Sequence, residues 1–498
     1  MSNERKSVLI IGAGISGLST GIYARLNGYD TRIFEMHDKP GGYCTSWTRK
    51  GYTFDYSIHN LSGTLPDSEL HNVWLELGAF RGSDVVDHKE LVRVEDEKGN
   101  TFIVHSELKK TVAEMRRLSP QNGPLFKDYE KAAHRLRSLD LFAAALGGWK
   151  RTLRMLPYLG ILKKWGATTM GDFAKQIQGP FLRQAFPLTQ YGIPDLPMIV
   201  HLIFVSGLDR GDLGWPQGGS LAFAKRMEQR HLVLGGKIDY HAKVERIIVE
   251  GGRAVGVRLA DGSEHRADII VAACDGHALQ YSLLEGKYVT REMEEYFQSA
   301  PSRQSFGLQL SLGVKRDLSQ EPHAIALLLD EPIRLEDEDI PFLNIEVFGP
   351  VTRMAPEGKG VIKVILDSNY DFWSQMARDP ELYQQKKDEV AEVVLGKLER
   401  RFPGLREQIE VVDVSTLLTA ERFTGNYHGL QPWDTKRAAL DLMRNGLNRT
   451  IPGVEGLYCV GQWAEGMVGI NTAALSGRRL VQTLCKQAGK KFVTSPKR

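Results

Sequence analysis

The sequence predicts an α/β fold organised around a parallel sheet, and three segments near the N-terminus carry this prediction. Residues 7–11 form a short, β-branched apolar run, which favours a buried parallel strand. Residues 15–26 place apolar side chains on one face of a helix, and Gly28 ends that pattern. Residues 31–34 have the pattern of a second strand. A strand, a helix and a strand in this order predict one unit of a doubly wound sheet.

The turn between the first strand and the helix is rich in glycine, and residues 12–17 (GAGISG) have the spacing G-x-G-x-x-G. Gly12 permits a tight turn, Gly14 lets the backbone approach a pyrophosphate, and Gly17 lets the helix pack closely on the strand. The helix N-terminus offers free N–H groups and a partial positive charge to phosphate. The turn therefore predicts a Rossmann-like dinucleotide site.

Glu35 follows the second strand and lies roughly 20 residues past the glycine-rich turn. An acidic residue at that place accepts hydrogen bonds from the hydroxyls of a nucleotide ribose. The alternatives are a glycine-rich turn without a ligand and an ordinary surface carboxylate at Glu35. The order of strand, turn, helix, strand and acid favours dinucleotide binding.

A second glycine pair, Gly41-Gly42, follows this acid, and residues 51–59 (GYTFDYSIH) come next. This arrangement resembles the second FAD-contacting segment of the two-dinucleotide-binding-domain flavoproteins, in which an F-D-x-G-like segment also wraps the pyrophosphate and flavin. Ser57 stands where many of those proteins have glycine. NAD dehydrogenases of the Rossmann type lack this segment, so the predicted cofactor is FAD rather than NAD.

The chain has 498 residues, which exceeds one ordinary domain and predicts two interleaved domains. We expect a discontinuous FAD-binding domain from residues 1–90, 215–290 and 415–498, and an α+β substrate domain from residues 91–214 and 291–414. Hydrophobic residues make up 42% and charged residues 25%, a globular balance that argues against disorder. The net charge of +3 is too small to indicate a nucleic-acid partner.

The cysteines are scattered and include no C-x-x-C pair; they are Cys44, Cys274, Cys459 and Cys485. This pattern predicts reduced thiols and no metal site. The N-terminus leads directly into a strand, so we expect no cleavable signal peptide, and no apolar run is long enough to cross a bilayer. The sequence therefore predicts a cytoplasmic protein, or one that lies at the surface of a membrane.

Residues 91–105 have the pattern of a hairpin, and residues 106–139 are rich in helix formers. The segment 141–170 differs, because it mixes bulky apolar and aromatic residues with lysine and arginine and contains no acidic residue. That composition is typical of helices lying in a membrane interface. A helical lid packed on the substrate domain is the other interpretation.

The second half of the chain is richer in strand patterns. Residues 244–273 predict a three-strand meander ending in a buried strand, and residues 306–368 predict a broad antiparallel sheet that forms a wall of the substrate pocket. Residues 380–402 have the pattern of a charged helix.

A strand at 457–460 ends in Gly461, and a glycine-rich loop leads into a helix. A helix N-terminus facing the N1–C2=O edge of a flavin would stabilise the negative charge of the reduced form.

Together these segments resemble the phytoene desaturase, carotenoid isomerase and retinol saturase group of FAD-dependent oxidoreductases over nearly the whole chain. The motifs that carry the resemblance are GAGISGLS, FEMHDKPGGYCTSW, FDYSIHNLSG, WPQGGSLAFAKRM, V-x-x-I-x-V-x-G-G-x-A-x-G-V, LTAERFTG and GLYCVGQWAEGMVGINTAALSGR. The WPQGGS element and the long middle region favour this group over amine oxidases. Gln462 departs from the pattern, because many of these proteins have an acid there that contacts the ribityl or phosphate region.

The glycine-rich turn and the resemblance together predict the residues that contact the cofactor. They are Gly12, Gly14, Ile15, Ser16, Gly17, Glu35, Gly41, Gly42, Tyr43, Val244, Gly461, Gln462, Gly469 and Ile470. The group supplies no catalytic triad that can be transferred. The candidates for a catalytic role are His59, Tyr56, Glu465 and Asn471, because their loops should converge beside the flavin ring. For His59, a structural hydrogen bond is an equal alternative.

The resemblance implies desaturation, saturation or isomerisation of double bonds in a long apolar substrate, such as a carotenoid, a retinoid or another isoprenoid. In a desaturation a hydride passes to the flavin, and a base or water takes the proton. The direction of the reaction and the electron acceptor stay open. One rival is a flavin amine oxidase with a polar pocket. The other is a prenyl-binding protein without flavin, similar to Rab GDP-dissociation inhibitors, and the intact glycine-rich turn and Glu35 weigh against it.

Overall fold

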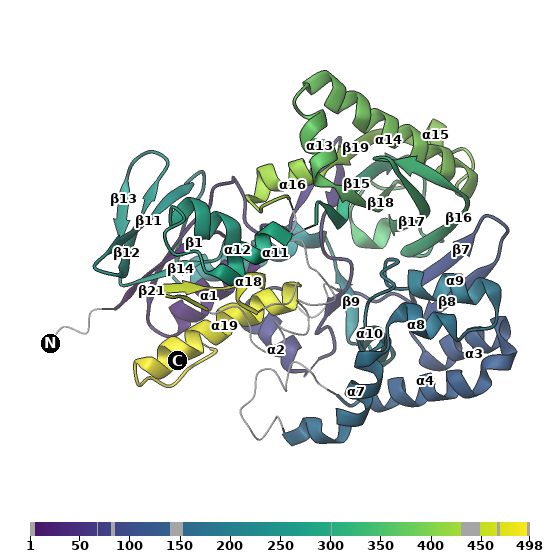
Figure 1. Cartoon of the computed structure of the whole chain (residues 1–498), viewed down its shortest axis with the longest axis horizontal. Helices are drawn as coiled ribbons and strands as arrows, with labels where there is room; N and C mark the ends of the chain where they lie inside the picture. Colours follow the sequence, from purple (N-terminus) through teal and green to yellow (C-terminus); the bar gives the residue numbers. More distant parts are fainter. Residues whose placement is uncertain are drawn as a thin grey trace.

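The computed structural model describes residues 5–66, 68–80, 85–139, 153–299, 301–429, 449–465 and 469–495. Two large sheets dominate this part of the chain, with helices packed around them (Figure 1). Two small sheets join neighbouring loops. One small sheet pairs β3 (Ser46–Arg49) with β4 (Tyr52–Asp55). The other has three strands, with β9 (Leu213–Pro216) between β5 (Leu61–Ser62) and β6 (Val85–Val86).

The first large sheet has the N-terminal strand near its centre. Its strands, in order, are β10 (Lys237–Asp239), β2 (Asp30–Phe34), β1 (Ser7–Ile11), β14 (Ile269–Ala272), β21 (Val454–Cys459), β12 (Arg253–Leu259) and β11 (Val244–Glu250), with β13 (Glu264–Arg266) on β12 and β20 (Thr450–Ile451) on β21. β1 pairs in parallel with both β2 and β14. Because parallel strands inside a sheet need cover on both faces, β1 and β14 are apolar at nearly every position. The predicted α/β class with a Rossmann-like unit is confirmed.

Helix α1 (Ile15–Leu26) begins directly after the glycine-rich turn. The Gly12 N–H donates to the Phe34 carbonyl at 2.8 Å, and Gly12 has a φ of +100°, which favours glycine. A Cβ atom on Gly17 would lie 2.0 Å from the Gly12 oxygen. Gly17 therefore allows α1 to pack on the turn at a distance that no other residue permits.

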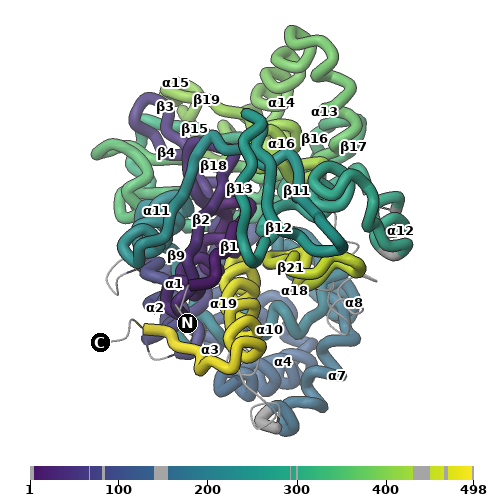
Figure 2. Tube along the Cα trace, turned by 90° about the vertical axis from the view of Figure 1, so that its left-hand side faces the viewer, coloured from purple at the N-terminus to yellow at the C-terminus, as the bar shows by residue number. Residues whose placement is uncertain are grey.

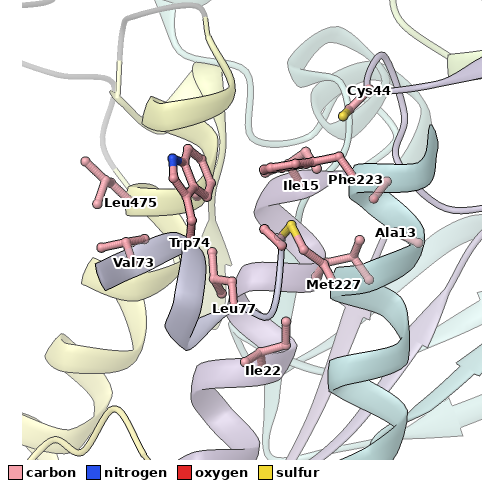
Figure 3. Close-up of a cluster of buried hydrophobic side chains, with 14 of the residues drawn as sticks. Ala13, Ile15, Ile22, Cys44, Val73, Trp74, Leu77, Phe223, Met227 and Leu475 are labelled. Carbon is pink, nitrogen blue, oxygen red and sulfur yellow. The ribbon is translucent and has the colours of Figure 1, made fainter. Parts of the chain in front are cut away.

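Helix α1 is packed among helices from distant parts of the chain. Figure 3 shows its apolar side chains facing those of α2 (Glu69–Glu76), α11 (Gly219–Val233) and α19 (Ile470–Gln487). Trp74 of α2 is fully buried in this cluster, and its indole N–H donates to the Ser62 carbonyl at 2.8 Å. The Ser19 hydroxyl donates to the Ala474 carbonyl at 2.6 Å. The first and last helices of the chain are thus held together, as Figure 2 also shows.

The predicted meander is only partly correct. β11, β12 and β13 form an antiparallel meander, but its third strand is β13 at residues 264–266. The buried strand that the sequence pattern assigned to the meander is β14, which pairs in parallel with β1 and β21. The physical reason is its composition, because Ile269–Ala272 is apolar at every position and all four residues are buried. Such a strand belongs inside a parallel sheet.

The second large sheet contains the predicted antiparallel strands and more. Its order is β19 (Ile409–Ser415), β15 (Arg303–Val314), β18 (Gly360–Asn369), β17 (Glu338–Phe348), β16 (Ala324–Leu335), β7 (Glu90–Asp96) and β8 (Thr101–His105). The predicted hairpin is present as β7 and β8, and β7 joins the sheet in parallel with β16. Each sheet thus draws on separated parts of the chain. The domain boundaries given above stay a prediction.

Two groups of helices cover the second sheet. One lies beside the hairpin and packs on its apolar side chains (Figure 1); its helices are α3 (Leu108–Leu118), α4 (Gly123–Leu136), α7 (Leu159–Ala167), α8 (Met170–Lys175), α9 (Pro180–Leu188) and α10 (Met198–Arg210). The other packs on β15 to β18 and contains α13 (Tyr370–Met376), α14 (Pro380–Arg401) and α15 (Leu405–Gln408). The predicted charged helix is α14. The other α-helices of the described residues are α12 (Arg291–Ser299), α16 (Leu417–Thr424) and α18 (Gln462–Glu465).

The predicted lid or membrane-contact segment, residues 141–170, lies partly outside the described residues, because the description resumes at residue 153. In its second part, Trp165 is buried against Phe173, with ring centroids 5.9 Å apart. Leu156 and Leu159 are instead 57% and 53% exposed. Among the helices that the structure describes, none combines the length and hydropathy needed to cross a bilayer.

Candidate functional site

A cavity of about 1170 Å³ connects the two large sheets. Its lining includes the glycine-rich turn and the ends of β2 and β14 on one side, and β7, β15, β16, β17 and β18 on the other. Small-molecule sites in proteins usually measure roughly 300–1,000 Å³. The cavity is thus at the large end for a small-molecule site, and residues of both sheets line it.

The glycine-rich turn forms one wall of the cavity together with the second glycine pair. The Gly41 N–H donates to the Ala13 carbonyl at 2.9 Å, and Gly14 and Gly41 form an isolated parallel bridge. Gly14 has an ordinary φ of −64°, and the nearest atom to a Cβ built on it is the Gly41 oxygen at 4.0 Å. The cavity side of Gly14 is thus open backbone at the N-terminus of α1, which is the arrangement that binds phosphate.

Glu35 lines the same part of the cavity at the end of β2 and is 8% exposed. Its Oε2 accepts the Ala13 N–H at 2.7 Å, and its Oε1 accepts the His37 N–H at 2.9 Å. These two bonds fix the carboxylate beside the turn. Each carboxylate oxygen offers two acceptor sites, so Glu35 retains the capacity to accept hydrogen bonds from ribose hydroxyls.

The C-terminal segment closes this part of the cavity. Gly461 follows β21 with a φ of +96°, and its N–H donates to the Ser476 hydroxyl at 2.9 Å. Helix α19 begins at Ile470, and Gly469, Ile470 and Asn471 line the cavity. The positive end of a helix of 18 residues therefore opens onto it.

Asp275 is a cavity residue that the sequence reasoning missed. It lies three residues past the end of β14, is 3% exposed, and accepts the Ala278 N–H at 2.8 Å. Burial raises the pKa of Asp275 to about 6, despite hydrogen bonds from backbone N–H groups. Its position offered a signal, because an acid shortly after a buried parallel strand lies at the same edge of the sheet as Glu35.

The wall from the second sheet carries a buried ion pair. Glu346 of β17 and Lys363 of β18 are cross-strand partners, their side chains are 3% and 0% exposed, and Lys363 Nζ lies 2.5 Å from Glu346 Oε2. His59 Nδ1 lies 2.5 Å from the other carboxylate oxygen, Oε1. Burial alone would raise the pKa of Glu346, but His59 and Lys363 outweigh burial and lower that pKa well below its usual range. Glu346 is therefore ionised at neutral pH.

Two aromatic rings flank His59 in the cavity. The ring centroid of His59 lies 5.2 Å from that of Tyr191 and 5.5 Å from that of Phe306. Tyr191 has a φ of +57° and Phe306 a φ of +62°, which are left-handed values that bulky side chains rarely adopt. Phe306 lies at an irregularity in the pairing of β15 with β18, where a bulge changes the direction of a side chain.

Most residues predicted to contact the cofactor line the cavity. They are Gly12, Gly14, Ile15, Ser16, Glu35, Gly41, Gly42, Tyr43, Val244, Gly461, Gln462, Gly469 and Ile470. Gly17 does not line the cavity, because it faces the Gly12 carbonyl inside the turn. The roles of all these residues toward a cofactor stay a prediction.

The catalytic candidates differ in their position relative to the cavity and in their ability to exchange a proton. His59, Tyr56 and Asn471 line the cavity, whereas the side chain of Glu465 lies outside the described part of the chain. Tyr56 stacks on Tyr43 with ring centroids 5.8 Å apart, and burial raises the pKa of Tyr56. A phenol that keeps its proton can donate a hydrogen bond but cannot serve as a base at neutral pH. His59 is the candidate best suited to exchange a proton.

Sequence reasoning also missed the polar residues of the second sheet that surround His59. A signal for Glu346 and Lys363 existed, because each is the lone charge within an apolar strand pattern (FLNIEVF and GVIKVIL). Lone opposite charges in neighbouring apolar strands indicate a buried ion pair. The backbone conformations of Tyr191 and Phe306 had no comparable signal.

Comparisons with known proteins agree with this geometry. A family model described as an NAD(P)-binding Rossmann-like domain matches residues 10–77. The chain is 28% identical to the chloroplastic prolycopene isomerase of Daucus carota, over 94% of this chain and 78% of that protein. It is 25% identical to the neurosporene-forming phytoene desaturase of Rhodobacter capsulatus, over 96% of this chain and 93% of that protein.

A solved structure extends the comparison to the fold. An oxidoreductase from Methanosarcina mazei superposes with a TM-score of 0.61 at 17% identity, covering 96% of this chain and 100% of that chain. This likeness confirms the fold over nearly the whole length. The sequence matches confirm the resemblance that the motifs predicted.

Proposed function

We propose that this chain, a nearly full-length relative of prolycopene isomerases and phytoene desaturases, is an FAD-dependent enzyme that acts on carbon–carbon bonds of a long apolar isoprenoid of the carotenoid class. The observation that carries the proposal is the cavity itself. It joins a dinucleotide-type glycine turn to an apolar and aromatic wall within one volume of about 1170 Å³.

The residues at the first sheet fit the cofactor. Gly14 and Gly41 leave open backbone for a pyrophosphate, Glu35 has free acceptor sites for a ribose, and the N-terminus of α19 favours negative charge on a flavin. When bound, FAD accepts or donates a hydride, which is the chemistry that amino-acid side chains lack.

The second sheet provides the environment for the apolar chain. Apolar residues on this side of the cavity are Leu91, Ile325 and Ile365 of the sheet and Phe204 of α10, which keep a substrate chain out of water. Desaturation of a CH–CH unit gives up one hydride and one proton as the double bond forms, so a group in the cavity has to accept a proton. On the wall from the second sheet, His59 is a residue that can accept it.

The rival functions predict different cavities. A flavin amine oxidase needs a site for an ammonium cation, but Glu346, the buried carboxylate on the substrate wall, is already paired with Lys363. A prenyl-binding protein without flavin needs no open glycine turn. The geometry around Gly14 and Glu35 therefore favours the flavoenzyme.

We also propose that the protein contacts a membrane surface through the segment around α7. Leu156 and Leu159 are both more than half exposed, and Lys163 lies exposed on the same short helix region. Exposed leucines beside lysine are typical of helices lying in a membrane interface. A membrane contact there would allow an apolar substrate to enter without crossing water.

The experiment that tests the function is a turnover assay on the FAD-loaded protein. A cis-configured carotenoid and a more saturated isoprenoid are each incubated with reduced and with oxidised flavin, and the products are separated by chromatography. We expect isomerised, desaturated or saturated products from at least one pairing. Amines are tested in parallel for hydrogen peroxide release. Peroxide from amines without conversion of any isoprenoid would contradict the proposal.

A further inference from the structure

We propose that Glu346 and Lys363 are positioning residues that hold His59 in one tautomer and one orientation, so that its Nε2 atom is presented to the cavity as the acceptor of the substrate proton. The identity of the proton donor rests on the proposed function. The contacts of Glu346 with His59 and Lys363 are present in the chain without any ligand. They can therefore be tested separately from the proposed function.

The tautomer follows from the acceptor that His59 contacts. Glu346 is ionised, and a carboxylate oxygen can only accept a hydrogen bond. His59 Nδ1, at 2.5 Å from Glu346 Oε1, must therefore carry a proton. A neutral imidazole has one N–H, so the lone pair is left on Nε2. The side chain of His59 is 23% exposed and lines the cavity, where this lone pair is available to a substrate.

Lys363 shares the carboxylate of Glu346 with His59. Lys363 Nζ occupies the second oxygen of Glu346 at 2.5 Å and also donates to the Asp55 carbonyl at 3.4 Å. An ionised carboxylate with no other partner would favour a protonated imidazole, and an imidazolium cannot accept a proton. Because Lys363 already neutralises the carboxylate, the pair as a whole is uncharged.

The other titratable groups around His59 do not change this balance. His323 packs against His88 with ring centroids 3.8 Å apart; burial lowers the pKa of both, and that of His88 falls to about 2. Burial raises the pKa of Tyr191, so its phenol is neutral. Burial also raises the pKa of Asp55, whose carboxylate accepts both the Ser220 N–H and hydroxyl. Among the described residues, Glu346 is the carboxylate in contact with His59, and Lys363 is the cation paired with Glu346.

The ring orientation is fixed by three contacts at once. Glu346 holds Nδ1, while Tyr191 and Phe306 contact the ring from two further elements. A bulky residue with a left-handed backbone is strained and persists where the surrounding structure demands it. Two such residues beside His59 indicate that the fold holds the His59 ring in one orientation.

The step served by this arrangement is a proton transfer coupled to hydride loss. One substrate C–H bond breaks and its proton forms a new N–H bond on Nε2. Its electron pair would become the second bond of C=C, and the neighbouring carbon would lose a hydride, for which a bound flavin would be the acceptor. The reverse sequence saturates a double bond with a proton from the same nitrogen.

The first test measures the tautomer in cofactor-free protein. Nitrogen-15 NMR of histidine-labelled wild type, with His59→Asn for assignment, should show a protonated Nδ1 and an unprotonated Nε2 on His59. In Lys363→Met both nitrogens should be protonated at the same pH. Glu95→Gln is the matched control, because buried Glu95 belongs to the same sheet, pairs with Arg401 and does not line the cavity. An unprotonated Nδ1 in wild type would overturn the proposal, even if every variant failed to fold.

The second test uses the FAD-loaded enzyme. Glu346→Gln should lower kcat by roughly 10²- to 10⁴-fold with little change in KM, since a misdirected base loses its catalytic share. Glu346→Asp should restore part of the rate, and Glu95→Gln should leave kcat unchanged. A wild type without turnover would contradict the proposed function and leave the NMR result standing. A wild-type rate in Glu346→Gln would contradict the positioning role.

Discussion

Gly14 and Gly17 stand three residues apart in the same turn but meet different surroundings. A Cβ on Gly14 would face the cavity, with the nearest protein atom at 4.0 Å, and its φ of −64° suits any residue. Gly14→Ala should therefore fold normally and bind FAD about tenfold or more weakly, because the methyl group occupies the place of the pyrophosphate. Flavin absorbance after equilibrium dialysis measures this change.

Gly123→Ala is the control for this substitution. Gly123 begins α4, a Cβ there has no neighbour within 4 Å, and the residue does not line the cavity. It should retain both stability and flavin. Equal flavin binding by Gly14→Ala and wild type would show that the pyrophosphate does not lie at this turn.

Gly17→Ala should act on the fold instead. Its Cβ would lie 2.0 Å from the Gly12 oxygen and 3.2 Å from the Ala273 side chain. Because the first of these atoms is backbone, α1 would have to move, and we expect the free energy of unfolding to fall by about 3 kcal/mol or more. Urea unfolding of the cofactor-free protein measures it. A loss under about 0.5 kcal/mol would contradict the packing described here.

Asp275 makes stability depend on pH in a defined direction. Its pKa is about 6 in the folded protein, above the ordinary value of 3.8, so the folded state holds the proton more tightly. The stability that this proton provides is complete below about pH 4 and is lost as pH rises through 6, by about 3 kcal/mol in all.

Comparison with Asp275→Asn isolates this effect, because asparagine does not titrate. Unfolding free energies of the two cofactor-free proteins should diverge between pH 4 and pH 7.5, with wild type losing stability relative to the variant. Parallel curves would show that Asp275 titrates normally in the folded state.

At the scale of single elements, α7 and the turn before it test the membrane proposal. Lys164 is paired with Asp128 at 2.6 Å, so the exposed leucines are expected to contribute more than this lysine to membrane binding. Leu156→Ser with Leu159→Ser should abolish flotation with anionic liposomes. Leu232→Ser with Val233→Ser removes two exposed apolar residues at the end of α11 and should float like wild type. Equal flotation of both double variants would contradict the proposal.

The sequence predicted those elements whose patterns are local. The strand at 7–11, the helix at 15–26 and the hairpin at 91–105 were placed within one or two residues, because apolar periodicity and glycine turns specify them. The partner of β14 was not predictable from its own residues, since pairing with β1 and β21 depends on segments far away in the chain.

The residues of the candidate site likewise differ in whether a local sequence pattern predicts them. Glycines and an acid at fixed spacing marked the side of the cavity near the first sheet, because the phosphate and ribose contacts of a dinucleotide impose that spacing. The other side depends on residues from β15, β17 and β18 that meet His59 only after folding. His59 could be named from its loop, whereas Glu346, Lys363 and the two flanking aromatic rings needed the structure.

At the scale of the whole molecule, the two large sheets are assembled from interleaved segments of the chain (Figure 1). Residues of both sheets line the cavity. The β7–β8 hairpin from the N-terminal part of the chain completes the second sheet, and the C-terminal helix α19 packs on α1. Neither sheet by itself surrounds the cavity. Cofactor binding and substrate binding should therefore depend on each other.

The most direct measurement of this central claim is a flavin absorbance titration. FAD-loaded protein is mixed with increasing amounts of a colourless long-chain isoprenoid, and the visible flavin bands are followed. A saturable shift of these bands is expected, because the apolar chain replaces water beside the ring. A protein that takes up no FAD, or flavin bands that stay unchanged at every isoprenoid concentration, would contradict the account.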